Sequence, residues 1–268
     1  MAEQTPGPPA ESSFAPFEGN PDFALSLARG LRIIEAFQNC PEGATVGDVA
    51  ALTGLSRAAV RRSLMTMELL GYATHSGSRY RLATRILRLG FAFLSCNSLP
   101  ALAQPILEEI TAATQESSSV STLEGDEIVY LVRSATKRVM AVGLSVGSRL
   151  PAYCTSMGRV LLAALPEPAF AAYLARVELK RHTPKTMVGK TAFAKEIRRV
   201  RDHGFALVDE ELEIGLRSIA VPVRARTGKV VAAMNAGVQA ARVSKEDLIG
   251  RFLPVLRHGA QDLGQALR

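Results

Sequence analysis

The stretch LSRAAVRRSLMTMELLGY, residues 55–72, restricts the possible folds more than any other part of the chain. Its apolar side chains recur at steps of three and four residues, which predicts a helix that packs by one stripe. Ser56 is a suitable N-cap for this helix, and Gly71 supplies a stop. The stripe consists of Val60, Leu64 and Met67.

The opposite face of this helix carries arginines without compensating acids. Residues 56–88 hold seven arginines against one acid, Glu68, which is a net charge of +6. Residues 1–55 sum to −5, so the positive charge of a chain with a pI near 9.6 is focused on this region. A solvated surface helix would account for the arginines alone. A planar guanidinium also fits guanine edges and phosphates, which favours a helix that binds DNA.

The flanking segments complete the pattern of a DNA-binding domain. Thr45 can cap a short helix that ends at Gly54, and apolar spacing predicts an earlier helix over 23–39. Two short strands around Ser76–Gly77 form a hairpin that carries further arginines. This order predicts a winged helix–turn–helix over residues 23–84. The predicted DNA contacts are Thr45, Ser56, Arg57, Ala58, Arg61, Arg62, Arg79 and Arg81.

The segments on either side of this domain predict a tail and a linker, and the cysteines indicate the cellular compartment. Residues 1–22 are proline-rich and acidic, which predicts a disordered tail and not a signal peptide. Residues 85–98 resume helical spacing and predict a linker helix. The three cysteines form no CxxC motif, and no apolar run reaches membrane-spanning length. We therefore expect a cytoplasmic protein without a metal or other cofactor and without membrane contact.

The spacing changes after the linker. Residues 99–268 mix helical and strand-like segments, which predicts an α+β domain with helices on one or both faces of a sheet. Strand-like segments lie on either side of Gly125–Asp126, at 139–144, and as a buried pair at 218–223 and 229–238. Helical segments lie at 99–117, 156–165, 169–177, 193–204 and 245–267.

Two separated groups of motifs resemble the IclR family of bacterial transcription regulators. The first contains LARGLRIIEAF, TVGDVAALTGLSRAAVRRSLMTMELLGY and YRL. The second contains LPAYCTSMGRVLLAAL, DEELEIGLRSIAVPVR and RTGKVVAAMNAG. The resemblance covers nearly all of residues 23–268. It implies a winged helix domain, a linker helix used in dimerisation, and a GAF-like α/β effector domain at 99–268.

The resemblance also suggests a subgroup and an assembly. The SLARGL opening and the RVS…FLPVLR ending are similar to regulators of aromatic-acid breakdown through protocatechuate, p-hydroxybenzoate and β-ketoadipate. Dimers and tetramers are usual in the family, so a homodimer or tetramer is expected. The apolar face of residues 86–94 fits paired linker helices, and nearly as well a helix buried within one domain.

The effector is expected to be a small organic acid, aromatic or dicarboxylic. In AYCTSMGRVLLAAL a strand runs into a helix start, whose free N–H groups attract a carboxylate. The resemblance places the effector loop here, and DEELEIGLRSIAVP with its neighbouring strand would form a second wall. Alternatively, these hydroxyls only cap the helix, and Arg217 pairs with Glu213. The predicted effector-site residues are Cys154, Thr155, Ser156, Met157, Gly158, Asp209, Arg217, Ser218 and Asn235, of which Ser156, Arg217, Ser218 and Asn235 would make the polar contacts.

Three functions are compatible with these patterns. The leading hypothesis is a regulator whose affinity for a DNA operator responds to the acid. The others are an enzyme domain fused to a DNA-binding module and a second domain that only oligomerises. GLSVG matches a nucleophile motif around Ser145, but Pro151 disfavours the helix that must follow it. Cys154 with His182 or His203 has no supporting spacing, so we expect no enzymatic activity.

Overall fold

The computed structural model describes residues 14–17, 19–136 and 144–267, and the chain divides into two compact units, residues 1–95 and 96–268. Each unit has its own hydrophobic core. Most of the tail predicted at 1–22 and most of the strand predicted at 139–144 lie outside the described residues.

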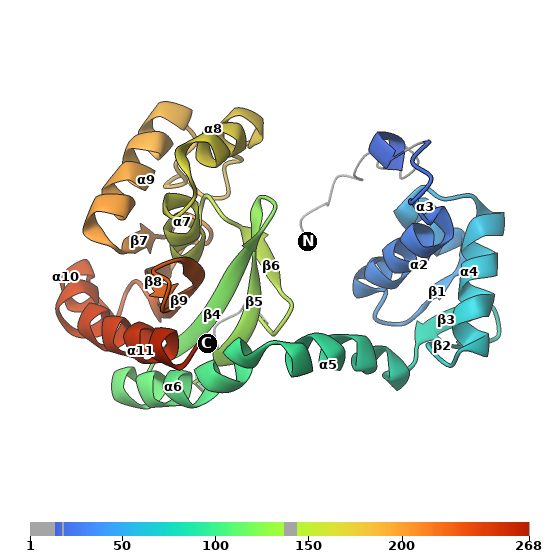
Figure 1. The fold of residues 1–268 in the computed structure, drawn as a ribbon, viewed down its shortest axis with the longest axis horizontal. Helices are drawn as coiled ribbons and strands as arrows, with labels where there is room; N and C mark the ends of the chain where they lie inside the picture. Colours follow the sequence, from blue (N-terminus) through green and yellow to red (C-terminus); the bar gives the residue numbers. More distant parts are fainter. Residues whose placement is uncertain (1–13, 18, 137–143, 268) are drawn as a thin grey trace. The chain divides into compact units, whose positions relative to one another are not determined.

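Unit 1 is a winged helix–turn–helix, as the sequence predicts (Figure 1). The stripe of the arginine-bearing helix is buried and packs against Ile33 and Val49 of the two preceding helices. The sheet is antiparallel in the order β1–β3–β2. The elements are η1 (Ala15–Phe17), α2 (Leu25–Ala36), η2 (Phe37–Asn39), β1 (Ala44–Thr45), α3 (Val46–Thr53), α4 (Arg57–Leu69), β2 (Ala73–Ser76), β3 (Arg79–Leu82) and η3 (Thr84–Ile86).

Local capping fixes the two helices of the helix–turn–helix. The Thr45 hydroxyl accepts a hydrogen bond from the Asp48 N–H at 3.2 Å, and the Asp48 carboxylate accepts one from the Thr45 N–H at 2.9 Å. This reciprocal pair is a capping box. Gly54 ends α3 with φ +68°, and the Ser56 hydroxyl accepts from the Ala59 N–H to begin α4. The predicted helix boundaries are therefore confirmed.

Some aromatic contacts of unit 1 involve residues within the segment 1–22 that the sequence predicts to be a tail. Phe17 stacks on Phe23 with ring centroids 4.9 Å apart, and Phe14 lies 6.0 Å from the same ring. Phe14 also packs against the core of unit 1. Burial of aromatic surface stabilises this contact. The predicted tail rested on proline content and charge and did not take these aromatic pairs into account.

The linker helix α5 (Leu87–Cys96) exposes its apolar side chains. None of its ten residues is buried, and Leu87 and Phe91 are 70% and 69% exposed. The alternative of a helix buried within one domain is therefore wrong. Among the described residues, no single helix has the length and hydropathy of a membrane span; Thr84–Cys96 and Ser98–Thr114 meet both criteria only together, across an 83° bend.

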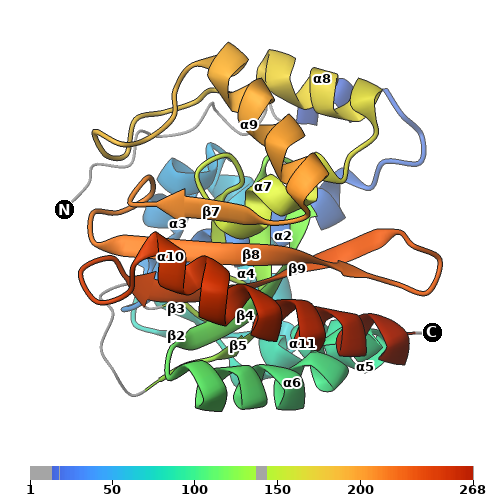
Figure 2. The ribbon, with the colours of Figure 1, turned by 90° about the vertical axis from the view of Figure 1, so that its left-hand side faces the viewer.

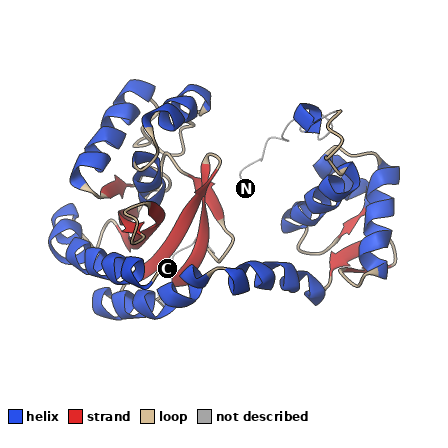
Figure 3. Cartoon of the chain, in the orientation of Figure 1, coloured by secondary structure: helices blue, strands red, loops and turns tan. Residues whose placement is uncertain are grey.

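Unit 2 is built on a six-stranded antiparallel sheet in the order β6–β5–β4–β9–β8–β7. Helices α6 and α11 cover one face, and α7 with α8 and α9 covers the other (Figures 2 and 3). The predicted α+β class is confirmed, with helices on both faces. The elements are α6 (Ser98–Thr114), β4 (Ser117–Glu124), β5 (Glu127–Ser134), β6 (Arg149–Pro151), α7 (Ser156–Ala163), α8 (Glu167–Arg176), α9 (Lys190–His203), β7 (Ala206–Asp209), β8 (Leu216–Arg224), β9 (Val230–Gln239), α10 (Lys245–Asp247), η4 (Leu248–Phe252) and α11 (Leu253–Ala266).

The helix predicted at 245–267 is not continuously α-helical. A π-helical turn, η4, separates α10 from α11. Pro254 follows this turn, and proline lacks the N–H that an α-helix would use and crowds the carbonyl four residues earlier. The wider π turn accommodates that conflict.

Candidate functional site

The first candidate site is the exposed face of α4. Arg57, Arg61 and Arg62 are exposed, and none of their guanidinium groups has a hydrogen-bond or ion-pair partner within the described chain. Ala58 is also exposed beside them. Guanidinium groups without internal partners, near the start of a helix, can donate hydrogen bonds to base edges and phosphates.

The hairpin arginines are held more tightly. Arg79 donates to the Gly43 carbonyl at 2.8 Å, and Arg81 donates to the Glu42 carbonyl at 3.2 Å. Each guanidinium has further N–H groups, so these bonds orient the side chains without saturating them. Glu68, the one acid of the helix, lies 2.6 Å from His75 of β2. The predicted DNA residues therefore lie on α4, on β3 of the β2–β3 hairpin, which is the wing, and at the N-caps of α3 and α4, Thr45 and Ser56.

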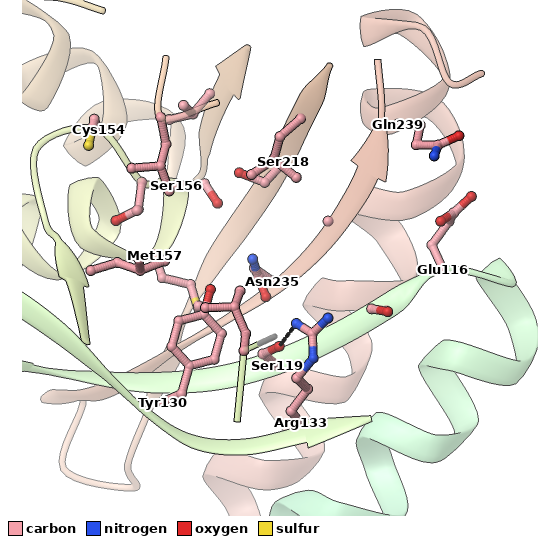
Figure 4. Close-up of a pocket in the computed structure, with 18 of the residues that line it drawn as sticks. Glu116, Ser119, Tyr130, Arg133, Cys154, Ser156, Met157, Ser218, Asn235 and Gln239 are labelled. Carbon is pink, nitrogen blue, oxygen red and sulfur yellow. Dashed lines mark hydrogen bonds between the residues drawn. The ribbon is translucent and has the colours of Figure 1, made fainter. Parts of the chain in front are cut away.

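The second candidate site is a cavity of about 80 Å³ in unit 2, between the sheet and the start of α7 (Figure 4). This volume is several times the roughly 10–15 Å³ that one water molecule occupies by the same measure. Five predicted effector residues from the AYCTSM loop and β8 line it together with Asn235 of β9. The lining includes Cys154, Thr155, Ser156, Met157, Ser218 and Asn235.

One row of polar side chains crosses the floor of this cavity. Ser119 of β4 is directly opposite Asn235 of β9 on one side and Arg133 of β5 on the other. Residues directly opposite in antiparallel strands point to the same face, so all three side chains face the cavity. Arg133 donates to the Ser119 hydroxyl at 3.4 Å, the contact drawn in Figure 4. The sequence reading missed Arg133 and Ser119.

A β-bulge brings Tyr130 to the same face. Val120 pairs with Val132 and Ser121 pairs with Tyr130, so Leu131 is an extra residue in β5. Burial raises the pKa of the Tyr130 hydroxyl to about 12, partly offset by the charge of Arg133. Tyr130 is therefore a neutral hydrogen-bond donor at neutral pH.

Two buried oxygens in the cavity wall have no hydrogen-bond partner. They are the Ser156 hydroxyl, in a residue 1% exposed, and the Asn235 side-chain carbonyl, in a residue 8% exposed. By contrast, the Thr155 hydroxyl accepts from the Gly158 N–H and caps α7. Buried polar atoms are usually paired, so two unpaired oxygens in one cavity wall indicate acceptor positions for a ligand.

Three predicted effector residues do not line the cavity. A Cβ on Gly158 would lie 2.1 Å from the Ala152 carbonyl oxygen, so the missing side chain permits close backbone packing. Arg217 pairs with Asp209 at 2.6 Å, directly across β7 and β8, and not with Glu213. Arg217 also donates to two backbone carbonyls of the loop after β9, at 240 and 243.

The lining of the cavity includes an ion pair that the sequence analysis also missed. Glu116, buried at the start of β4, accepts from Arg242 at 2.7 Å. The two charges compensate each other. Gln239 lies on the same side (Figure 4).

A buried ion pair supports the loop that precedes α7. Arg159 is 1% exposed and donates to the Glu211 carboxylate at 2.7 Å and to the Tyr153 carbonyl at 2.9 Å. Glu211 also accepts from the Met187 N–H. The start of α7 is thus fixed to the loop between β7 and β8.

The motifs of the enzyme hypothesis lack catalytic geometry. After Ser145 the chain enters β6 and not a helix. Burial raises the pKa of the Cys154 thiol to about 12, which keeps it protonated. His182 is bonded to the Tyr153 hydroxyl, and His203 to the Arg199 carbonyl. Within the described ranges, no group of three His, Cys, Asp or Glu side chains is placed to hold a metal.

Comparisons with known proteins identify both units. Residues 26–77 match the IclR helix-turn-helix domain, and residues 91–265 match the bacterial transcriptional regulator IclR C-terminal domain. The chain is 45% identical to the Pca regulon regulatory protein of Pseudomonas putida, over 96% of this chain and 93% of that protein.

Two crystal structures are similar to this fold. A candidate transcriptional regulator from Rhodococcus sp. RHA1 has 45% identity and a TM-score of 0.81, over 91% of this chain and 98% of that one. The inducer-binding domain of Acinetobacter PobR, a double mutant in complex with 3-hydroxybenzoic acid, has 35% identity and a TM-score of 0.60, over 63% of this chain and 98% of that one. Such relatives are regulators and not enzymes, and this chain belongs to the IclR family of bacterial transcriptional regulators.

Proposed function

We propose that the protein is a sequence-specific regulator whose operator binding responds to a small organic acid bound in the cavity of unit 2. The observation that carries this proposal is a cavity with two unpartnered buried oxygens, Ser156 Oγ and Asn235 Oδ1, in a chain that also bears an exposed cationic helix face. The first feature suits a small polar ligand, and the second suits DNA.

The DNA-binding surface consists of the exposed face of α4 and the wing. Arg57 and Arg61 stand one helical turn apart and reach both base edges and the neighbouring phosphates, while Arg62, Arg79 and Arg81 bind phosphates. Ser56 and Thr45 lie at helix starts, where hydroxyl and N–H groups bind phosphate. Ala58 permits close approach of the helix to the groove.

The acid is aromatic or dicarboxylic and belongs to aromatic-acid breakdown. The name of the Pseudomonas putida relative and the 3-hydroxybenzoic acid bound to the PobR domain support this class. The contacts are Cys154, Thr155, Ser156, Met157, Ser218 and Asn235, which line the cavity. Gly158, Asp209 and Arg217 act behind this lining: Gly158 allows close packing against backbone, Arg217 binds Asp209 and two backbone carbonyls, and Asp209 also binds Lys245.

The active form is a homodimer or tetramer. The exposed apolar side chains of α5 support this part of the proposal. None of the ten residues of α5 is buried, and a contiguous exposed apolar patch usually marks a contact with another protein. Pairing of two copies along α5 would bury Leu87 and Phe91 and bring two α4 helices to two half-sites.

The test is fluorescence anisotropy with DNA from upstream of the protein's own gene, supplemented by a genome-wide selection for binding sites. Protein is titrated with and without 4-hydroxybenzoate, 3,4-dihydroxybenzoate and 3-oxoadipate. We expect sequence-selective binding that one acid shifts by about 5- to 150-fold, the range of useful allosteric couplings. Selective binding that no acid changes would contradict the ligand-responsive part, and the absence of any selected sequence would contradict the whole proposal. Turnover of an acid would instead favour the fused-enzyme alternative.

A further inference from the structure

The cavity of unit 2 has an unequal distribution of charge. Arg133 and Arg242 are the cations that line it, and Glu116 is the acid. Arg242 is neutralised by Glu116 at 2.7 Å, whereas Arg133 has no ion-pair partner among residues 14–17, 19–136 and 144–267. An anion entering the cavity therefore meets one uncompensated charge, at Arg133.

The surroundings of Arg133 leave its guanidinium available. Its single hydrogen bond within the described chain, to Ser119, is long at 3.4 Å. Strand β6 pairs with β5 only at Glu127–Val129, so no described strand covers the other side of Arg133. A planar guanidinium with free N–H groups binds a carboxylate through two parallel hydrogen bonds. Tyr130, on the same face, can donate a third bond because its hydroxyl is protonated.

The unpartnered oxygens have a different chemistry. Ser156 and Asn235 are neutral and nine-tenths or more buried, so they suit a neutral polar group such as a hydroxyl or a keto oxygen. A second carboxylate at Ser156 would meet neither of the two cations that line the cavity, Arg133 and Arg242. In Figure 4, Ser156 lies on the side of Cys154 and Met157, away from Arg133 and Glu116, whereas Asn235 lies between them, beside Ser119.

Apolar side chains connect the two polar ends. Met157, Leu144, Leu150 and Leu212 line the cavity beside the ring of Tyr130. These side chains favour a ligand whose middle part is apolar, such as a ring or a short carbon chain.

We propose that Arg133 binds the carboxylate of the effector, and that Ser156 binds a hydroxyl or keto group at the other end of its apolar body, with Asn235 between the two. This orientation rests on the proposed function, because it assumes that an acid occupies the cavity. It adds Arg133 as the residue that selects an acid over a neutral analogue, and it assigns Ser156 to recognition of the second polar group.

The experiment is isothermal titration calorimetry of the full-length protein with 4-hydroxybenzoate, 3,4-dihydroxybenzoate and 3-oxoadipate. The variants are Arg133→Gln, Arg133→Lys and Ser156→Ala. The control is Arg149→Gln, which removes an arginine of the same sheet that pairs outside the cavity with Glu124 and Glu127. Circular dichroism and thermal unfolding check that each variant is folded.

Arg133→Gln is expected to weaken binding of the acid about 10- to 100-fold, the usual effect of losing a charged hydrogen bond. Arg133→Lys is expected to restore part of that loss, and Arg149→Gln to change nothing. For the aromatic probe, 4-hydroxybenzamide is expected to bind weakly and equally to wild type and Arg133→Gln. Ser156→Ala is expected to weaken 4-hydroxybenzoate but not benzoate.

The outcomes distinguish failure of the proposed ligand orientation from failure of the proposed function. Acid binding by the wild-type protein that Arg133→Gln leaves unchanged would overturn the orientation and leave the proposed function intact. Equal losses for 4-hydroxybenzoate and benzoate in Ser156→Ala would overturn the assignment of Ser156. If none of the three acids binds the wild-type protein, both the proposed function and the orientation fall.

Discussion

Substitution of Arg61 gives the most direct test of the DNA-binding surface. Arg61 is exposed on α4 and has no partner within the described residues, so Arg61→Ala removes a charge without breaking an internal contact. Arg79→Ala differs, because Arg79 also donates to the Gly43 carbonyl. Comparing the two variants separates loss of a phosphate contact from loosening of the wing.

The magnitude follows from counterion release. Each neutralised phosphate contributes about −0.9 to the slope of log affinity against log salt concentration. If all five predicted arginines neutralise one phosphate each, the slope is about −4.5 per bound protomer, and a fourfold rise in salt weakens binding about 500-fold. Arg61→Ala should make the slope less steep by about 0.9 per protomer.

The assay is fluorescence anisotropy on a selected operator at several salt concentrations. Arg149→Ala, in unit 2, is the control and should leave the slope unchanged. Arg79→Ala should change the slope by a similar amount and also lower the melting temperature of unit 1, whereas Arg61→Ala should change only the slope. An unchanged slope in Arg61→Ala, with wild-type stability, would refute the role of the α4 face.

Three further predictions concern unit 2. Gly158→Ala should destabilise unit 2 by more than the roughly 1–3 kcal/mol of ordinary overpacking, because the new Cβ meets the Ala152 backbone. Urea unfolding measures this loss. Gly250→Ala is the control and should cost little, because a Cβ at that position has open space around it. Glu211→Gln should cost about 3–5 kcal/mol in the same assay, because buried Arg159 then keeps only the more distant carboxylate of Glu196, at 3.9 Å; a normal unfolding midpoint would contradict a strong Arg159–Glu211 pair. Burial raises the pKa of Asp209, but hydrogen bonds from Arg217 and Lys245 outweigh this and hold it below its usual value. Its contribution to stability should therefore be present above about pH 4 and decline at lower pH as the carboxylate is protonated, and Asp209→Asn should flatten that acid dependence of the melting temperature.

Unit 1 was predictable because its signals are local. The spacing of Val60, Leu64 and Met67 lies within two helical turns, and Ser56 and Gly54 act on their immediate neighbours. Such signals depend on the next three or four residues and not on the rest of the fold. What the sequence reading missed here, such as the stacking of Phe17 on Phe23, depends on the path of the chain between them.

The cavity of unit 2 was predictable only in part, because strand register determines its floor. Regular alternation places Tyr130 and Arg133, three residues apart, on opposite faces of β5. The bulge at Leu131 brings them to one face, and no residue type marks that bulge in the sequence. The loop before α7 was predictable, because the hydroxyl-rich start of a helix is a local signal, as Thr155 and Ser156 illustrate.

Register also explains why one arginine is available to a ligand and another is not. Arg217 was the stronger candidate by sequence, since it precedes a buried strand beside three acids. In the sheet it lies directly opposite Asp209, and a carboxylate at that position satisfies it. Arg133 lies directly opposite Ser119, whose hydroxyl carries no charge, and β6 ends its pairing with β5 before reaching it. Because an anion binds best where a cation lacks an internal partner, the neighbour across the strand decides which arginine is available to an anion.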